Sequence, residues 1–516
     1  MSDGQTFAGD ANRLNVQRLF AMLMVMALFV IALRETVDPD LWWHLRTGEQ
    51  ILNVGIPRQD IYSFTVPDHP WVTHEWLSEV LLWIVYAGGG LPGLMLAFAG
   101  IVALAFVLVY KRCAGRPYLA GFVTILAAIT AAPFAGARPQ MLNLLFAAVF
   151  VNLLEGFRQG ALERRWLWLL PLFTIIWANL HSGYLIGVTL ILVYAIGGQL
   201  DRLTGEAGQG LSRADPVLLL GLAALSLLAA VFNPNGATLW SYPLVTLGSE
   251  AMQQQIFEWQ SPNFHLRIFQ PFAGLLAVGV GGLILSRKRP PWTDLILFGG
   301  LAGAALFSRR HIPLFAIVTL PIITRSLLSS LGGTSWYPLA AGRATNRKMN
   351  KDGFLRRLNW LLLVLALGAA SIYTAQRLAG NDEVIAEFFP VAAVEYLEES
   401  GLARQRGFNH YAWGGYLIWH GIQVYTDGRA DVYGDDFLWE LRDIETLDQG
   451  WQEPLHRYDV DYVLTRASST LAGGLLLSDQ WDEVYRDDLA VIFVNTESVT
   501  VDPHRVGEKV VSAVSR

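Results

Sequence analysis

Charged residues and cysteine are both scarce in this sequence. Only 16% of its 516 residues are charged, whereas about 25% is usual in soluble proteins. The mild net charge of −6 argues against a nucleic-acid-binding protein, which would carry a basic surface stripe. A single cysteine, Cys113, excludes a disulfide framework and a zinc site built from cysteines. Apolar residues, in contrast, make up 53% of the chain, and 18 residues are tryptophan.

Long apolar segments recur through most of the chain. A membrane-spanning helix needs about 20 mostly apolar residues. Eleven segments are candidates: 17–36, 93–110, 118–136, 139–156, 166–181, 183–200, 215–232, 269–286, 293–308, 311–328 and 358–376. Residues 76–90, "WLSEVLLWIVYAGGG", are shorter and include Glu79, so they predict an interfacial or re-entrant helix, with a twelfth span as the alternative. The sequence therefore predicts a polytopic α-helical membrane protein.

Basic residues in the short loops predict the orientation in the membrane. If the N-terminus is cytoplasmic, the inner loops contain "KRCAGR", "FRQGALERR", "SRKR" and "GRATNRKMNKDGFLRR". The outer loops then begin at Arg34, Ala137, His181, Asn233 and Ser308. No small-residue cleavage site follows the first apolar segment, which predicts a retained anchor. The absence of a eukaryotic retention signal favours the bacterial cytoplasmic membrane.

The composition changes after the last apolar segment. We expect a transmembrane domain over 1–378, with an outer loop at 34–92, and a soluble extracytoplasmic α/β domain over 379–516. "PVAAVEYLEESG" predicts an amphipathic helix, and "GYLIWHGIQVYTDGRADVYGDD" predicts two strands around a turn bounded by glycine, with Asp435 capping the next helix. The functional alternative for "DGRADVYGDD" is a loop that reads the acceptor or closes the pocket. "DYVLTR" and "DEVYRDDLAVIFVN" predict further strands, the latter a hairpin about Asp487 and Asp488. Residues 329–357 predict a flexible cytoplasmic loop.

The outer loop begins with "DPDLWWHLRTGE", which starts at Asp38. Asp38 and the following proline predict a helix N-cap with proline at the first helical position, and Gly55 predicts the helix end. Trp42 and Trp43 suit the headgroup layer of a membrane. Capping explains Asp40 less well, because the N–H groups of one first turn stabilise only limited negative charge.

A second acidic group closes the same outer loop, in "VTHEWLSE". Thr73 is suited to cap the helix that follows, and Glu75 would lie in its first turn, where the helix dipole favours it. The functional alternative is that Asp38, Asp40 and Glu75 converge at one pocket. There they would bind a divalent cation or withdraw a proton from a nucleophile.

Basic residues at the outer helix ends break the positive-inside pattern. "FSRRHIP" contains Arg309, Arg310 and His311, and "GARPQ" contains Arg138. An arginine at membrane depth costs about 2.5–3.5 kcal/mol on insertion scales, although snorkelling to the surface could account for any single one. Because arginine binds phosphate bidentately, the cluster predicts a site for a lipid phosphate. His181, in "WANLHSGY", is a further candidate ligand, with a turn as its alternative.

The chain resembles polyprenyl-phosphate-sugar-dependent membrane glycosyltransferases of the GT-C fold. This group includes protein mannosyltransferases, aminoarabinose transferases of lipid A and oligosaccharyltransferases. "TVDPDLWWHLRTGE" is similar to their first-loop motif, which implies that Asp38 or Asp40 is the catalytic or metal-binding aspartate. "NHYAWGGYLIWHG" resembles the domain after the last span of oligosaccharyltransferases, but its Trp413-Gly414-Gly415-Tyr416 has no aspartate. That departure argues against transfer to protein asparagine.

The resemblance implies transfer of a sugar from a polyprenyl-phosphate donor to a hydroxyl of an extracytoplasmic glycan, lipid or protein. Asp38 or Asp40 would act as general base, and Arg138, Arg309 and Arg310 would stabilise the departing phosphate. A single displacement with inversion follows from the absence of a second flanking carboxylate. Asp38, Asp40 and His74 could also hold Mg²⁺ or Mn²⁺. The alternatives are a transporter or flippase of lipid-linked sugars, and a non-catalytic binding protein of the same fold.

Overall fold

A computed structural model describes residues 14–204, 215–342 and 353–497. Within it the chain forms two compact units, and each is built from segments distant in sequence. The helical unit comprises Met1–Arg34, Met95–Pro234 and Glu258–Ala379. The α/β unit comprises Glu35–Leu94, Asn235–Phe257 and Gly380–Arg516. The outer loop that the sequence assigns to the transmembrane domain is thus grouped with the C-terminal segment.

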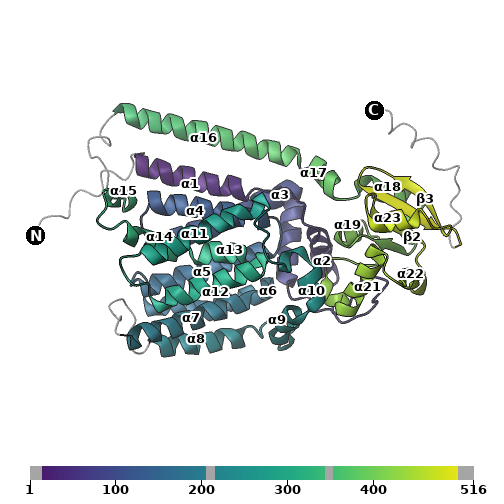
Figure 1. Cartoon of the computed structure of the whole chain (residues 1–516), viewed down its shortest axis with the longest axis horizontal. Coiled ribbons are helices and arrows are strands. Elements are labelled where there is room, and N and C mark those ends of the chain that lie inside the picture. Colours follow the sequence, from purple (N-terminus) through teal and green to yellow (C-terminus); the bar gives the residue numbers. More distant parts are fainter. Residues whose placement is uncertain (1–13, 205–214, 343–352, 498–516) are drawn as a thin grey trace, which may run out of the picture. The chain divides into compact units, whose positions relative to one another are not determined.

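Every one of the predicted apolar segments is helical. In chain order the helical unit contains α1 (Val16–Ala32), the second part of α3 (Trp76–Tyr110), α4 (Tyr118–Ala131), α5 (Gln140–Arg158), α6 (Leu169–Leu180), α7 (Tyr184–Leu203), α8 (Asp215–Ala229), α11 (Gln270–Leu285), α12 (Trp292–Phe307), α13 (Ile312–Val318), α14 (Leu320–Ser330), α15 (Tyr337–Ala340) and α16 (Gly353–Ala379). Figure 1 labels these elements. Of the predicted loop at 329–357, α15 is ordered and residues 343–352 lie outside the described residues.

Five of the described helices are long and apolar enough to cross a membrane. They are Trp76–Tyr110, Gln140–Arg158, Tyr184–Leu203, Arg267–Leu285 and Gly353–Ala379, and the pair Arg309–Val318 and Leu320–Ser330, bent by 55°, makes a sixth if it is one span. Four further apolar helices are shorter. The protein is therefore a polytopic helical membrane protein, and the number of eleven spans stays a prediction.

Gly90 divides α3 into two helices. Its backbone has φ 61° and ψ −161°, a region that only glycine enters readily. The segment 76–90 is therefore a helix of its own, separate from the apolar helix that follows it.

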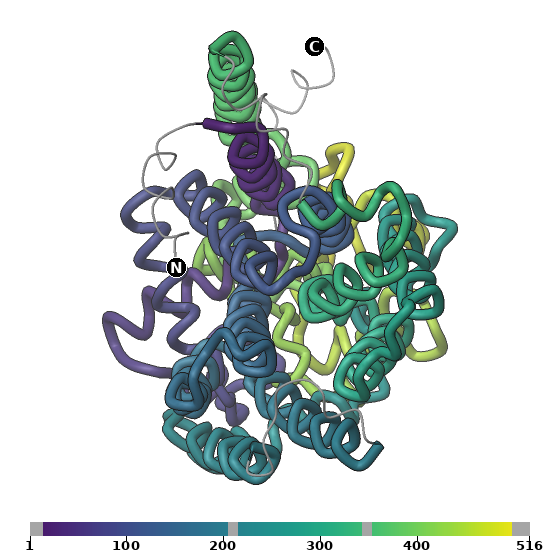
Figure 2. The backbone as a smooth tube through the Cα atoms, turned by 90° about the vertical axis from the view of Figure 1, so that its left-hand side faces the viewer, coloured from purple at the N-terminus to yellow at the C-terminus, as the bar shows by residue number. Residues whose placement is uncertain are grey.

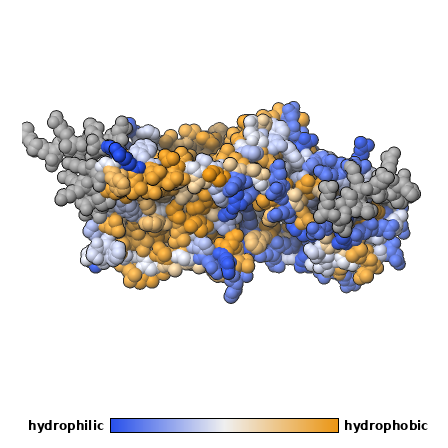
Figure 3. Space-filling model, turned by 90° about the horizontal axis from the view of Figure 1, so that it is seen from above, coloured by the Kyte–Doolittle hydropathy of each residue, from blue (hydrophilic) through white to orange (hydrophobic). Residues whose placement is uncertain are grey.

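The surface of the helical unit is apolar. α16 is the most exposed of these helices, because only 11% of its most apolar 18-residue stretch is buried. It packs beside α1 (Figures 1 and 2). Its exposed side chains include Trp360, Leu361, Val364, Leu365 and Ile372. Hydrophobic residues cover a broad area of this unit (Figure 3). Because exposed apolar surface of this extent is stable only in a non-aqueous environment, it indicates contact with lipid.

A buried ionic network ties four helices of this unit together. Arg158 of α5 contacts Asp294 of α12 at 2.7 Å and Glu155 at 2.8 Å. Arg325 of α14 contacts Glu155 at 2.6 Å and Asp294 at 2.8 Å. The hydroxyl of Tyr194 of α7 donates to Glu155 at 3.0 Å. Two cations thus balance two anions, which is how charges are tolerated inside a membrane protein.

The α/β unit contains a four-stranded sheet of order β1-β2-β4-β3. The strands are β1 (Gly407–Asn409), β2 (Tyr462–Arg466), β3 (Trp481–Arg486) and β4 (Ala490–Asn495). β1 and β2 are parallel, and the other pairs are antiparallel. The predictions of the strand in "DYVLTR" and of the hairpin about Asp487 and Asp488 are confirmed. Strand β1 was not predicted.

The same unit also contains several helices. They are α2 (Leu41–Asn53), the first part of α3, α9 (Thr238–Gly248), α10 (Glu250–Gln255), α17 (Asn381–Phe388), α18 (Val391–Ser400), α19 (Gly414–Trp419), α20 (Ala430–Tyr433), α21 (Asp435–Thr446), α22 (Gln452–Arg457) and α23 (Thr470–Leu475). The predicted amphipathic helix is confirmed as α18.

The prediction of two strands in "GYLIWHGIQVYTDGRADVYGDD" is wrong. The segment forms α19, α20 and the start of α21, and its only β pairing is a single bridge between Val424 and Ser63. A short apolar run fits a buried helix as well as a strand. Here Leu417 and Ile418 are neighbouring residues of the short helix α19, and both are buried.

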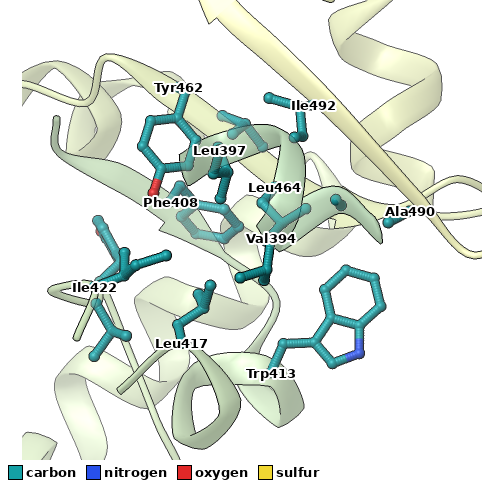
Figure 4. Close-up of a cluster of buried hydrophobic side chains, with 14 of the residues drawn as sticks. Val394, Leu397, Phe408, Trp413, Leu417, Ile422, Tyr462, Leu464, Ala490 and Ile492 are labelled. Carbon is teal, nitrogen blue, oxygen red and sulfur yellow. The ribbon is translucent and has the colours of Figure 1, made fainter. Parts of the chain in front are cut away.

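The core of the α/β unit joins side chains from both ends of the chain. Figure 4 shows its C-terminal part, where Phe408, Trp413 and Tyr462 pack among aliphatic side chains. Trp42 and Trp43 are only 4% and 7% exposed and belong to this core. The ring of Trp42 lies 5.1 Å from that of Tyr416. Their predicted place in the headgroup layer is therefore wrong, because they are covered by protein.

Candidate functional site

Asp38 and Asp40 lie at the start of α2, and both are partly exposed. The carboxylate of Asp38 accepts a hydrogen bond from the backbone N–H of Asp40 at 2.9 Å. The helix begins at Leu41, so the prediction of proline at its first position is wrong, and it ends at Asn53, close to the predicted stop. The carboxylate of Asp40 makes no cap bond and accepts instead from the indole N–H of Trp43 at 3.1 Å.

Gly428 brings the loop before α20 against Asp40. A Cβ atom at Gly428 would collide with the Asp40 carboxylate, so a larger residue there would require the Asp40 side chain to move. The hydroxyl of Tyr411 donates to the Gly428 carbonyl at 3.3 Å. Burial, and then the carboxylates of Asp40, Asp427 and Asp431, raise the pKa of Tyr411 well above its usual value. Several acidic groups therefore gather around this loop.

His74 and Glu75 lie near Asp431, one of the acids of this loop. The His74 Nε2 atom lies 2.8 Å from Glu75 Oε1, and both side chains are 11% exposed. The imidazole stacks at 4.3 Å against Tyr242, which in turn hydrogen-bonds to Asp431. Thr73, predicted as the cap of the next helix, donates its hydroxyl to the Pro57 carbonyl, and that helix begins at Trp76.

The pKa values of His74 and Asp431 are both raised. Burial opposes the charge on His74, but Glu75 and then Asp431 outweigh it, so the pKa of His74 lies above 6.5. Burial raises the pKa of Asp431, although His74 and the Tyr242 hydroxyl act against this. His74 is therefore suited to remain an imidazolium that balances Glu75.

We expect the ion pair of His74 and Glu75 to stabilise the fold at low pH and less at high pH. Because the folded pKa of His74 is raised, this contribution is complete below about pH 6.5 and is lost as the pH rises through the folded value. The difference in melting temperature between the natural protein and Glu75→Gln should be larger at about pH 6 than at about pH 9.

A matched control is Glu49→Gln, because Glu49 pairs with an arginine, Arg46, rather than with a histidine. Its effect on the melting temperature should be small and the same at both pH values. An equal effect of Glu75→Gln at both pH values would contradict the assignment.

Arg429 is buried and holds the loop before α20 in place. Its guanidinium contacts Asp427 at 2.6 Å and Asp60 at 2.7 Å, with side chains at most 1% exposed. It also lies 4.6 Å from the ring of Trp71, and Tyr433 donates to Asp427 at 2.7 Å. This arginine therefore joins the outer loop to the C-terminal segment and positions Gly428 and Asp431 on either side of it.

Replacing Arg429 with alanine should lower the free energy of unfolding by about 3–5 kcal/mol, because two buried carboxylates would lose their partner. Arg406→Ala is the control, since Arg406 is 54% exposed and pairs with an Asp459 that is 82% exposed. That change should cost less than about 1 kcal/mol. Thermal or denaturant unfolding in detergent measures both, and equal losses would contradict the anchoring role.

Asp435 caps a helix other than the predicted one. It is the first residue of α21 rather than its N-cap. Its carboxylate accepts from the Ser249 hydroxyl at 2.5 Å and from the backbone N–H groups of Glu250 and Ala251, at the start of α10. The Ser249 hydroxyl bond lowers the pKa of Asp435. The prediction of its capping partner was therefore wrong.

In the helical unit, the predicted arginines gather around one acid, Glu258. The guanidinium of Arg138 contacts both carboxylate oxygens of Glu258, at 2.5 and 3.3 Å. Burial opposes the charge on Glu258, but Arg138, Arg310 and Arg309 hold its pKa below the usual range. Three arginines thus lie near one carboxylate, and because arginine binds phosphate well, this group is suited to a phosphate anion.

The arginines of this basic group differ in their surroundings. Arg309 is 4% exposed and donates to the carbonyls of Gln260 and Ser261 at 3.2 and 2.9 Å. Arg310 lies over the ring of Trp259, 4.2 Å from its centroid, and is partly exposed. Arg309 thus holds the loop that carries Glu258, whereas Arg310 is oriented by the indole and reachable from outside the protein.

The two histidines that were predicted for the phosphate site, His181 and His311, both make backbone contacts. His181 Nδ1 accepts the N–H of Gly183 at 2.9 Å and lies 2.9 Å from the side-chain nitrogen of Asn143. It therefore fixes the turn before α7. His311 ends the short helix Arg309–His311 at the junction of α12 with α13, and its backbone N–H donates to the Ser308 carbonyl at 3.1 Å.

A metal site at Asp38, Asp40 and His74 stays a prediction. In residues 14–204, 215–342 and 353–497, no group of three His, Cys, Asp or Glu side chains is arranged to hold a metal ion. The Asp38 carboxylate accepts from its own turn and His74 is paired with Glu75.

Three residues of the site, Arg429, Asp431 and Glu258, were not predicted from the sequence. Asp431 and Arg429 lie in "DGRADVYGDD", where acids and an arginine alternate, but the predicted strands concealed their positions. Glu258, in "FEWQSPNFH", was not selected as a site residue. In the sequence Glu258 is an isolated acid beside a tryptophan. This pattern indicates a site residue only once Arg138 is known to contact it.

No protein-family model matches the sequence, and no curated protein matches it. Similar solved structures include the apo oligosaccharyltransferase of Archaeoglobus fulgidus, with TM-score 0.48 and 13% identity over 88% of this chain and 70% of that one. ArnT from Cupriavidus metallidurans bound to undecaprenyl phosphate has TM-score 0.47 and 15% identity over 93% and 98%. The arabinofuranosyltransferase AftD from Mycobacteria has TM-score 0.48 and 14% identity over 94% and 42%.

Proposed function

We propose that the protein is a membrane glycosyltransferase. It would move a sugar from a polyprenyl-phosphate donor to a hydroxyl of an extracytoplasmic glycan, lipid or protein, at the outer face of a bacterial cytoplasmic membrane. The observation that carries this proposal is the basic group of Arg138, Arg309 and Arg310 in a unit with an apolar surface. A phosphate attached to a long apolar chain satisfies both features.

The basic group would bind the phosphate and stabilise it as it leaves. Arg138 presents a bidentate fork, and Arg310 a partly exposed guanidinium held over Trp259. Both keep their charge at any relevant pH. As the bond between the anomeric carbon and the phosphate oxygen breaks, negative charge accumulates on that oxygen. Cations fixed beforehand stabilise this charge without reorganisation.

The acidic group would activate the acceptor. Asp40 is the candidate that we favour for the base, because its carboxylate accepts from a side chain, the Trp43 indole, whereas the Asp38 carboxylate accepts from a backbone N–H. The acceptor oxygen would form a bond to the anomeric carbon and pass its proton to Asp40. The bonding pair would leave with the polyprenyl phosphate, so the anomeric configuration inverts.

The test is a transfer assay with the full-length protein in liposomes. Polyprenyl-phosphate-linked pentoses and hexoses serve as donors, and the release of polyprenyl phosphate is measured with and without membrane extracts that supply acceptors. Release that depends on Asp40 supports the transferase. Movement of the intact donor between leaflets, without release, would support a transporter instead, and binding alone would support a non-catalytic protein.

A further inference from the structure

Glu258 occupies the donors that a phosphate would use. Its two oxygens face two nitrogens of Arg138, and this fork is the arrangement in which arginine binds phosphate. The same carboxylate is close enough to Arg310 and Arg309 to interact with their charges. The chain therefore supplies its own anion at the centre of the basic group.

The backbone beneath Glu258 is fixed, whereas its side chain is more accessible. The Ser308 hydroxyl donates to the Glu258 carbonyl at 3.1 Å, and the Arg309 N–H donates to the Gln260 carbonyl at 3.0 Å. The Glu258 side chain is 31% exposed, compared with 14% for Arg138. Rotation of the glutamate side chain would thus release Arg138 without moving the loop.

We propose that Glu258 is an internal competitor for the lipid phosphate. It would hold Arg138 between turnovers, be displaced when the donor binds, and return as polyprenyl phosphate leaves. The competition matters most at product release, because the phosphate monoester carries up to two negative charges at neutral pH and would otherwise remain on three arginines. This inference rests on the phosphate site of the proposed function but not on sugar transfer.

The test is equilibrium binding of farnesyl phosphate to the purified full-length protein in detergent. Glu258→Gln should bind it about 10-fold more tightly, because the phosphate no longer displaces a charged partner of Arg138. Glu258→Ala should change affinity in the same direction. Binding of farnesol, which has the chain but no phosphate, should be equal in all variants.

Glu250→Gln is the matched control, because Glu250 is exposed in the first turn of α10 and belongs to neither group. It should bind farnesyl phosphate like the natural protein. Unchanged or weaker binding by both Glu258 variants, with unchanged melting temperatures, would overturn the proposal. Tighter binding in a protein that transfers no sugar would uphold Glu258 as a competitor and reject the transferase. Sugar transfer by a protein in which the Glu258 variants leave binding unchanged would uphold the transferase and reject Glu258 as a competitor.

Discussion

Asp40→Asn should lower the rate of sugar transfer by about 10²–10⁴-fold, the contribution of a general base. The amide retains an oxygen for the Trp43 indole, which Asp40 now accepts at 3.1 Å, so the start of α2 should remain intact. It cannot take the proton of the acceptor hydroxyl. The measurement is the turnover of polyprenyl-phosphate-linked sugar in liposomes, and farnesyl phosphate should bind with unchanged affinity.

Asp38→Asn is the control for this experiment, because the Asp38 carboxylate accepts a backbone N–H in its own turn. The asparagine oxygen can accept the same bond, so we expect a loss of less than about tenfold. A larger loss with Asp38→Asn than with Asp40→Asn would transfer the role of base to Asp38. Unchanged turnover in both variants would reject a base at this position.

Arg310→Ala should lower turnover by about 10²–10³-fold, since it removes a cation fixed beside the departing phosphate. Trp259 orients this guanidinium from 4.2 Å, and Arg310→Lys should restore only part of the activity because an ammonium lacks the planar fork. Farnesyl phosphate should also bind more weakly to Arg310→Ala. Turnover and binding are measured in the same preparations.

Arg267→Ala provides the matched control, because Arg267 is an exposed arginine of the same unit outside the basic group. It should leave both turnover and phosphate binding unchanged. If Arg310→Ala affects melting temperature but neither binding nor turnover, the arginine stabilises the loop of Trp259 and the phosphate site is placed wrongly.

The basic group was partly predictable from sequence. Arg138, Arg309 and Arg310 break the charge pattern of the loops, and each follows or precedes an apolar segment, so local sequence identifies them. Glu258 was not predictable in the same way, because it lies 120 residues from its partner Arg138. The distinction between Arg309 and Arg310 also required the structure, which buries one among carbonyls and leaves the other over an indole.

The sequence by itself determined the helices and the C-terminal hairpin, because long apolar runs and alternating patterns specify them through local periodicity. Tertiary contacts decided the rest. Trp42 and Trp43 are core residues because the C-terminal segment covers them, and Arg429 is buried because Asp60, far away in sequence, meets it. A short apolar or charged segment takes its structure from such partners, and no local pattern carries that information.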